Sequence, residues 1–262
     1  MKKILSFLAA VWKANLQSAM EYRVSFLTQM FGMMLNNAMY FVVWMIFFDR
    51  FNEVNGWGLN EMFVTFGVTA SAFGLVSVLF GNAFNLGEII ARGRLDYYLS
   101  LPKPALLHAL ASRMIASGLG DLTYGYLSFA VSGYATAPAA WLRFTLAVLL
   151  AATVFAAFLI LVQSVAFWTG SSAGIAGLAV NAMVTFAIYP ITLFDSVARM
   201  ILFTLIPAAL MGAVPADFAR QFSWASLAQM LVGAVLLLGL AVGVFQLGLR
   251  RYESGSGIQI EV

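Results

Sequence analysis

The chain has 262 residues, of which 62% are hydrophobic and only 10% are charged, with a formal net charge of +3. Soluble domains contain roughly 45–50% apolar and about 25% charged residues, so this composition excludes an ordinary soluble fold and a disordered chain. It is typical of a protein whose surface faces lipid. The chain has no cysteine and one histidine, His108, so no disulfide, metal site or cofactor is expected.

Residues 1–22 predict a helix that lies in the membrane interface. Apolar side chains recur along one helical stripe, whereas Lys3, Lys13 and Gln17 lie away from it. This pattern suits a helix at the membrane surface, and Lys13 interrupts the apolar stretch that a signal peptide requires. A frayed leader ahead of the first span is the alternative. The stripe consists of Ile4, Leu5, Leu8, Val11, Trp12 and Leu16.

Six later segments are apolar over about 20 residues, the length that a helix needs to cross a bilayer. We therefore expect an all-α, polytopic membrane protein in a single domain with six transmembrane helices. The expected spans are Val24–Phe48, Met62–Phe80, Ala105–Val131, Leu142–Trp168, Ala173–Pro190 and Ser226–Leu249.

The distribution of basic residues predicts that both termini are cytoplasmic, because cytoplasmic segments carry an excess of Lys and Arg. With this orientation only Arg50, Arg143, Arg199 and Arg220, of the 14 Lys and Arg residues, lie outside. The tail formed by residues 252–262 is then cytoplasmic. The basic residues assigned to the inside are Lys2, Lys3, Lys13, Arg23, Arg92, Arg94, Lys103, Arg113, Arg250 and Arg251.

The cytoplasmic loop formed by residues 81–104 is expected to contain two short helices at the membrane surface. Leu86, Ile89 and Ile90 fall on one side of the first helix, and Gly93 is placed to end it. The loop is either an ordinary charged connector or a docking element for a soluble partner. The candidate docking residues are Glu88, Arg92, Gly93, Arg94 and Asp96.

Residues 191–225 predict a re-entrant or interfacial segment on the outer side, between the fifth and sixth spans. Pro190, which follows Tyr189, lacks a backbone donor and ends or kinks the fifth span. Asp195 and Arg199 are four residues apart and are expected to pair on one helical face. A seventh full span is the alternative, but it moves Arg250 and its basic neighbour to the outside.

Two polar residues fall within the third expected span, Arg113 and Asp121. A charged side chain at the centre of a membrane helix costs about 2.5–3.5 kcal/mol on insertion scales, so Asp121 is expected to face protein or a watery cavity. It either lines the conduit or makes a structural hydrogen bond. The pairs Gly170–Gly174 and Gly239–Gly243 have the spacing that permits close approach of helices.

The segment Gly93–Leu99, followed by Leu101–Pro102, resembles the signature loop of ABC-2 type transporter permeases. Shorter similarities occur in the same order along nearly the whole chain. They are Glu21-Tyr22-Arg23, Gly56-Trp57 with Glu61, Ser112-Arg113, Gly120-Asp121, Tyr189-Pro190, Ile206-Pro207 and Pro215-Ala216.

This resemblance implies the permease subunit of an ATP-driven transporter, usually an exporter, in the cell (inner) membrane. Such permeases pair with an identical or different permease and with two cytoplasmic ATPase subunits, which contact the N-terminal helix and the first cytoplasmic loop. The chain itself has no phosphate-binding P-loop motif, so any ATP hydrolysis is expected in a partner chain and this subunit is not expected to be an enzyme. An apolar or amphipathic cargo is expected, because intramembrane charge is scarce. A passive channel, an ion-coupled carrier and a membrane scaffold are the alternatives.

Overall fold

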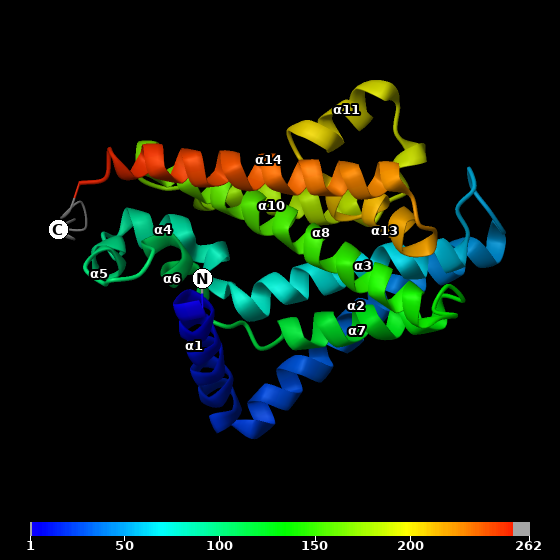
Figure 1. The fold of residues 1–262 in the computed structure, drawn as a ribbon. Coiled ribbons are helices and arrows are strands. Elements are labelled where there is room, and N and C mark those ends of the chain that lie inside the picture. Colours follow the sequence, from blue (N-terminus) through cyan, green and yellow to red (C-terminus); the bar gives the residue numbers. More distant parts are fainter. Residues whose placement is uncertain (1, 254–262) are drawn as a thin grey trace.

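The computed structural model describes residues 2–253, and within them the chain is helical, with one isolated backbone bridge between Val54 and Trp57. Figure 1 shows long helices running side by side, with shorter helices gathered at the two ends. The longer elements are α1 (Lys2–Glu21), α2 (Arg23–Arg50), α3 (Leu59–Leu79), α7 (Gly118–Val131), α8 (Pro138–Ser164), α10 (Ala173–Ala187) and α14 (Trp224–Leu249). The shorter ones are η1 (Gly81–Asn85), α4 (Leu86–Ala91), α5 (Leu95–Leu99), α6 (Ala105–Ala111), α9 (Ala166–Thr169), η2 (Ile191–Leu193), α11 (Ser196–Thr204), α12 (Ala208–Met211) and α13 (Ala213–Arg220).

The core of the bundle is formed by α3 and α8, which pack against each other and are the most buried of the long helices. Val68 of α3, Phe155 of α8 and Phe218 of α13 belong to one apolar cluster of buried residues. In contrast, α2 and α14 expose most of their apolar side chains. Lipid or another membrane subunit is therefore needed to cover these two helices.

Glycines allow α3 and α7 to approach until their backbones touch. A Cβ atom added at Gly74 would lie 2.5 Å from the carbonyl oxygen of Gly118, and one added at Gly67 would lie 2.8 Å from that of Gly125. By contrast, Cβ atoms at Gly174, Gly239 and Gly243 would meet nothing within 4 Å, and the same holds for Gly170. The close approach of small residues that membrane helices use thus occurs at a pair that the expected motifs do not include.

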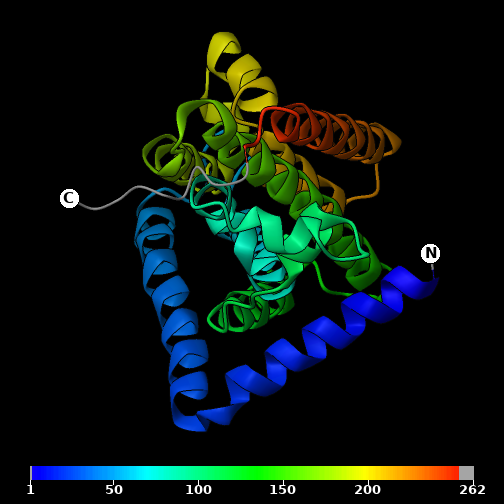
Figure 2. The same ribbon diagram turned by 90° about the vertical axis from the view of Figure 1, so that its left-hand side faces the viewer.

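Helix α1 is confirmed and lies across one end of the bundle. In Figure 1 it runs at a steep angle to α3, α8 and α14, and Figure 2 shows α1 and α2 as two sides of a wide V. The short helices α4, α5 and α6 lie at the same end, which we call the α4–α5 end. A helix in this position suits the membrane interface; its interfacial location and the cytoplasmic placement of both termini stay predictions.

Within residues 2–253, four helical stretches are long and apolar enough to cross a membrane, namely α2, α3, Pro138–Thr169 and α14. They match the first, second, fourth and sixth expected spans. The count rises to five if α11 and Ala208–Arg220, which meet at a bend of 66°, form one broken span or a re-entrant loop. The expectation of six continuous spans is not reproduced. The fifth span, α10, has only 15 residues and is about 22 Å long, against a hydrocarbon core of about 30 Å.

The third expected span is interrupted between α6 and α7, because polar groups compete with the helical hydrogen bonds there. The side chain of Ser112 donates to the carbonyl oxygen of Ala109. The backbone N–H of Gly81 donates to the carbonyl oxygen of Arg113, and the N–H of Ile115 donates to that of Ser77. Arg113, expected inside the membrane span, instead lies in this connection with an exposed side chain.

Candidate functional site

Residues 81–104 fold into η1, α4 and α5, which confirms the two expected short helices in this loop. Leu86, Ile89 and Ile90 are buried against the bundle, whereas the side chains of Glu88 and Arg92 are exposed and form an ion pair of 3.1 Å. Gly93 ends the first helix with a φ of +69°, a conformation that glycine adopts without strain.

The charges of this segment are held together on its exposed side. The guanidinium of Arg94 donates to Glu88 Oε1 at 2.8 Å, so one carboxylate binds both arginines of the loop. Asp96 lies in the first turn of α5. Burial first, and then this aspartate, raise the pKa of Tyr252 to about 12.

A buried glutamine fastens α4 to the bundle. Gln163 of α8 is 6% exposed, and its Nε2 donates to the carbonyl oxygen of Phe84 at 2.6 Å. Its Oε1 accepts from the backbone N–H of Gly87 at 3.2 Å and from the hydroxyl of Ser172 at 2.8 Å. One amide therefore links η1, α4 and the turn before α10. A Cβ atom at Gly87 would lie 1.9 Å from the Ser172 hydroxyl, so glycine is required at that position.

A cavity of about 880 Å³ adjoins this glutamine. It lies between α4 on one side and the α9–α10 turn on the other, with Asn181 of α10, Arg251 and Glu253 also on its wall. Helix α4 and the start of α10 are therefore joined through the hydrogen bonds of Gln163. Beside these bonds the two helices are separated by the cavity and do not pack closely over the whole face.

Helix α1 is bound to the same end. Trp12 Nε1 donates to the carbonyl oxygen of Leu79 at 2.8 Å, and Asn15 Nδ2 donates to that of Ala111 at 2.8 Å. Phe7 packs edge-on against His108, with a ring-centre distance of 4.9 Å. Of the expected apolar stripe, Leu8 is buried against the protein while others, such as Leu5, stay exposed.

Asp121 is 4% exposed and faces protein. Asn37, in the middle of α2, donates to its Oδ1 at 2.7 Å, while Oδ2 has no hydrogen-bond partner. The structure thus gives this acid one neutral donor, and Arg113 does not approach it within ion-pair distance.

The segment after Pro190 departs from its expected ion pair. Asp195 caps α11 by accepting from the N–H of Ala198 at 2.8 Å, as a helix N-cap does. Arg199 donates to the carbonyl oxygen of Phe194 at 2.8 Å, and the ion pairs found within residues 2–253 do not include one between Asp195 and Arg199. Tyr189 packs on Trp44 of α2 at a ring-centre distance of 5.3 Å.

A compact polar cluster lies at the end of the bundle opposite the α4–α5 end. We call its members, Trp57, Glu61, Tyr134 and Arg220, the α3–α13 cluster. Glu61 accepts from the hydroxyl of Tyr134 and pairs with Arg220 at 3.3 Å, and the guanidinium lies 5.5 Å from the centre of the Trp57 ring. Burial first, and then the hydrogen bond to Glu61, raise the pKa of Tyr134.

The sequence pattern assigns no site role to the residues that hold these sites together, namely Gln163, Asn37, Glu61 and Arg220. Gln163 carries a signal that would have found it, because a polar side chain near the end of an apolar span requires a partner. Asn37 carries the same signal in the first span. Glu61 and Arg220 carry no such signal, since they lie at span ends where charges are ordinary.

The comparisons with known proteins identify one family. A sequence model of the family described as ABC-2 family transporter protein matches residues 34–256, which is most of the chain. Searches of curated proteins and of solved structures give no match.

Proposed function

The chain belongs to the ABC-2 transporter family and is a multi-pass membrane permease of an ABC transporter, and from this we propose that it exports an apolar or amphipathic substrate, driven by separate ATPase subunits. The observation that carries the ATPase-driven part of this proposal is the segment formed by α4 and α5. Its apolar side is buried in the bundle while Glu88, Arg92 and Arg94 form a charged surface on the other side.

We propose that this surface, with Gly93 and Asp96, is where the ATPase docks. The phosphate-binding motif that ATP hydrolysis needs is missing from the sequence, so the ATPase is assigned to a partner chain. Helix α1 would contribute to the same contact, because Asn15 binds it to α6 and Trp12 binds it to the end of α3.

The motion of the ATPase would reach the bundle through Gln163. The hydrogen bonds of this side chain join η1 and α4, which carries part of the proposed docking surface, to α8 and to the start of α10. The adjoining cavity leaves space for α4 to move relative to α10. At the opposite end, Tyr189, Pro190, Asp195 and Arg199 would belong to the segment that closes the exit.

A second permease, identical or different, is proposed as the partner in the membrane. Asn36 lies in the middle of α2 with an exposed side chain, and an amide facing lipid at that depth is costly. Cover by a second permease or a watery path between the two removes that cost. The proposed location is the cell (inner) membrane.

Transport into inside-out vesicles tests the proposal. Vesicles that contain the permease and its ATPase are expected to accumulate a fluorescent alkyl amphiphile when ATP is added, and the non-hydrolysable ATP analogue serves as the control. Accumulation that responds only to a strongly polar solute would refute the apolar cargo. ATP-independent flux of either probe would favour a channel instead.

A further inference from the structure

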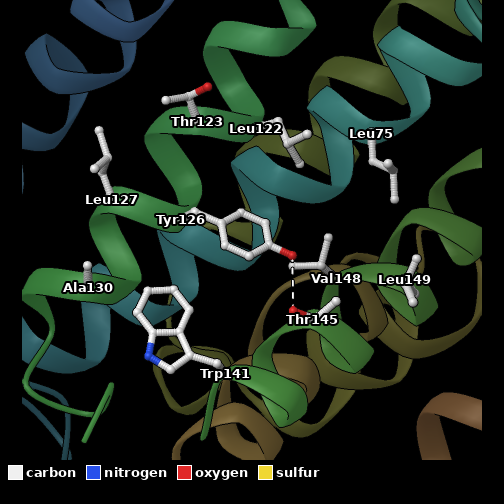
Figure 3. A pocket seen from close by; sticks show the side chains of 10 residues that line it. All are labelled: Leu75, Leu122, Thr123, Tyr126, Leu127, Ala130, Trp141, Thr145, Val148 and Leu149. Carbon is white, nitrogen blue, oxygen red and sulfur yellow. Dashed lines mark hydrogen bonds between the residues drawn. The ribbon is translucent and has the colours of Figure 1, made fainter. Parts of the chain in front are cut away.

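A groove with a volume of about 500 Å³ runs along the surface between α7 and α8. We call it the α7–α8 groove. As Figure 3 shows, its walls are side chains of α7 from Leu122 to Ala130 and of α8 from Trp141 to Leu149, with Leu75 of α3 at one end. Leu127 and Leu149 on its two sides are exposed, so the groove opens on the outer surface of the bundle, beside α8, which is long and apolar enough to cross the membrane.

The hydroxyl groups that line the groove are already paired. The Tyr126 hydroxyl donates to Thr145 Oγ1 at 3.1 Å across the floor, as the dashed line in Figure 3 marks. The Thr123 hydroxyl donates to the carbonyl oxygen of Leu119 at 2.7 Å. A largely apolar surface whose hydroxyls are paired offers water few partners, so the groove suits a hydrocarbon.

The length of the groove matches one leaflet. The eight-residue separation of Trp141 and Leu149 along α8 corresponds to about 12 Å of helix rise, and one leaflet contributes about half of a hydrocarbon core of roughly 30 Å. Trp141 stands at the end that faces the loop before α8, where tryptophan is favoured at the edge of the membrane.

At its Trp141 end, the groove is followed by the polar backbone of the loop before α8. A second cavity of about 550 Å³ shares Trp141 and Thr145 with the groove and is otherwise formed by residues from Ala135 to Leu142. It includes Thr136 and the start of α8 at Pro138. A molecule with a long apolar part and a polar end fits this succession, with its apolar part along the helices and its polar end at the loop.

We propose that the α7–α8 groove binds one acyl chain of a bilayer phospholipid, whose glycerol end lies at the loop formed by residues 135–138. A helix of a second copy does not fit, because α7 and α8 touch across the floor through Tyr126 and Thr145 and a helix is about 10–12 Å wide. The proposal requires neither ATP nor a partner chain, so it stands or fails independently of the proposed export.

Photolabelling tests the proposal directly. The purified chain is placed in phosphatidylethanolamine–phosphatidylglycerol vesicles with a trace of phosphatidylcholine that carries a diazirine at the end of one acyl chain. After illumination, mass spectrometry maps the labelled residues. Labelling of Leu75, Thr123 and Leu149 is expected to exceed that of Leu236, an exposed residue of α14, several-fold. Equal labelling of both sites would overturn the proposal, since it would mean that only bulk lipid touches the groove.

Two alanines provide matched variants. Ala130→Trp places a large side chain in the groove, whereas Ala228→Trp makes the same change at an exposed position of α14 near the same end of the bundle. The first is expected to abolish the excess labelling and the second to preserve it. If Ala130→Trp fails to fold, Thr123→Phe fills the groove from the other end. Excess labelling that survives a folded groove-filling variant, or cross-links between α7 helices of two copies, would contradict the proposal.

Discussion

Arg220 and Glu61 form an ion pair of 3.3 Å although 159 positions separate them in the sequence. Glu61 also accepts from the backbone N–H of Gly58 at 2.8 Å and thereby caps α3. The pair joins the last turn of α13 to the first turn of α3. It therefore holds the segment between the fifth and sixth expected spans at the end of the bundle opposite the proposed ATPase contact.

Removing Glu61 is expected to destabilise this end of the bundle. Glu61→Ala removes one of the two carboxylates that pair with the mostly buried Arg220 and also removes the cap of α3, at an expected cost of about 1–3 kcal/mol. Asp217→Asn is the matched control, because Asp217 pairs with the same arginine at 3.3 Å but is more exposed, and exposed pairs contribute about 0–1 kcal/mol. Unfolding in mild detergent measures the stability of both variants. An equal loss of stability in the two variants would contradict the central role of Glu61.

Gly74→Ala is expected to force α3 and α7 apart. The added Cβ would lie 2.5 Å from the carbonyl oxygen of Gly118 and 2.6 Å from the N of Leu122, and overpacking of this kind costs about 1–3 kcal/mol. Gly177→Ala is the control, since nothing lies within 4 Å of the new atom and alanine is the better helix former by up to about 1 kcal/mol. A lower unfolding temperature is expected for the first variant only; an unchanged value for Gly74→Ala would disprove the backbone contact.

Gln163→Leu is expected to loosen the docking segment. The change removes the acceptor of the Gly87 N–H and of the Ser172 hydroxyl, which costs about 1–3 kcal/mol when groups remain buried and unpaired. Amide hydrogen exchange of α4 should become faster, while Gln229→Leu, at an exposed position of α14, should leave it unchanged. In the ATPase complex, we expect Gln163→Leu to keep ATP hydrolysis but to lose transport. If the variant has a loosened α4 but still couples ATP hydrolysis fully to transport, Gln163 does not transmit the motion of the ATPase to the bundle.

Asp121→Asn separates a structural role from a transport role. Asparagine retains an oxygen that accepts from Asn37, so the variant is expected to insert and fold normally. If the acid lines the conduit, one of the two roles expected for it from the sequence, ATP-driven accumulation in vesicles should fall. Full export by a normally inserted variant would show that Asp121 is only structural. Asn37→Leu removes the donor altogether and is expected to lower the stability by about 1–3 kcal/mol.

The sequence predicted the helices whose character is set locally. Apolar length identified α2, α3, α8 and α14, and amphipathic spacing identified α1 and the buried side of α4. These features depend on residues close together in the chain, and periodicity reports on them directly.

Other features depend on residues far apart, and local pattern does not reveal them. The break before α7 arises from hydrogen bonds that Ser77 and Gly81 make with the residues around Arg113. Four-residue spacing predicts that Asp195 pairs with Arg199, but its carboxylate instead accepts a hydrogen bond from the backbone N–H of Ala198. The heptad spacing of Gly67 and Gly74, repeated in Gly118 and Gly125, was present in the sequence, but only the fold shows that the two pairs meet.

The ATP-driven permease is tested most directly by purifying the tagged chain from its native membranes in mild detergent and identifying the proteins that accompany it. A P-loop ATPase in stoichiometric amount is expected. It should be lost with Arg94→Glu and Asp96→Asn combined and retained with Arg50→Glu, an exposed arginine near the opposite end of the bundle. A folded chain that carries no ATPase, or an ATPase that stays bound to the docking variant, would contradict the proposed ATP-driven permease or its docking surface, respectively.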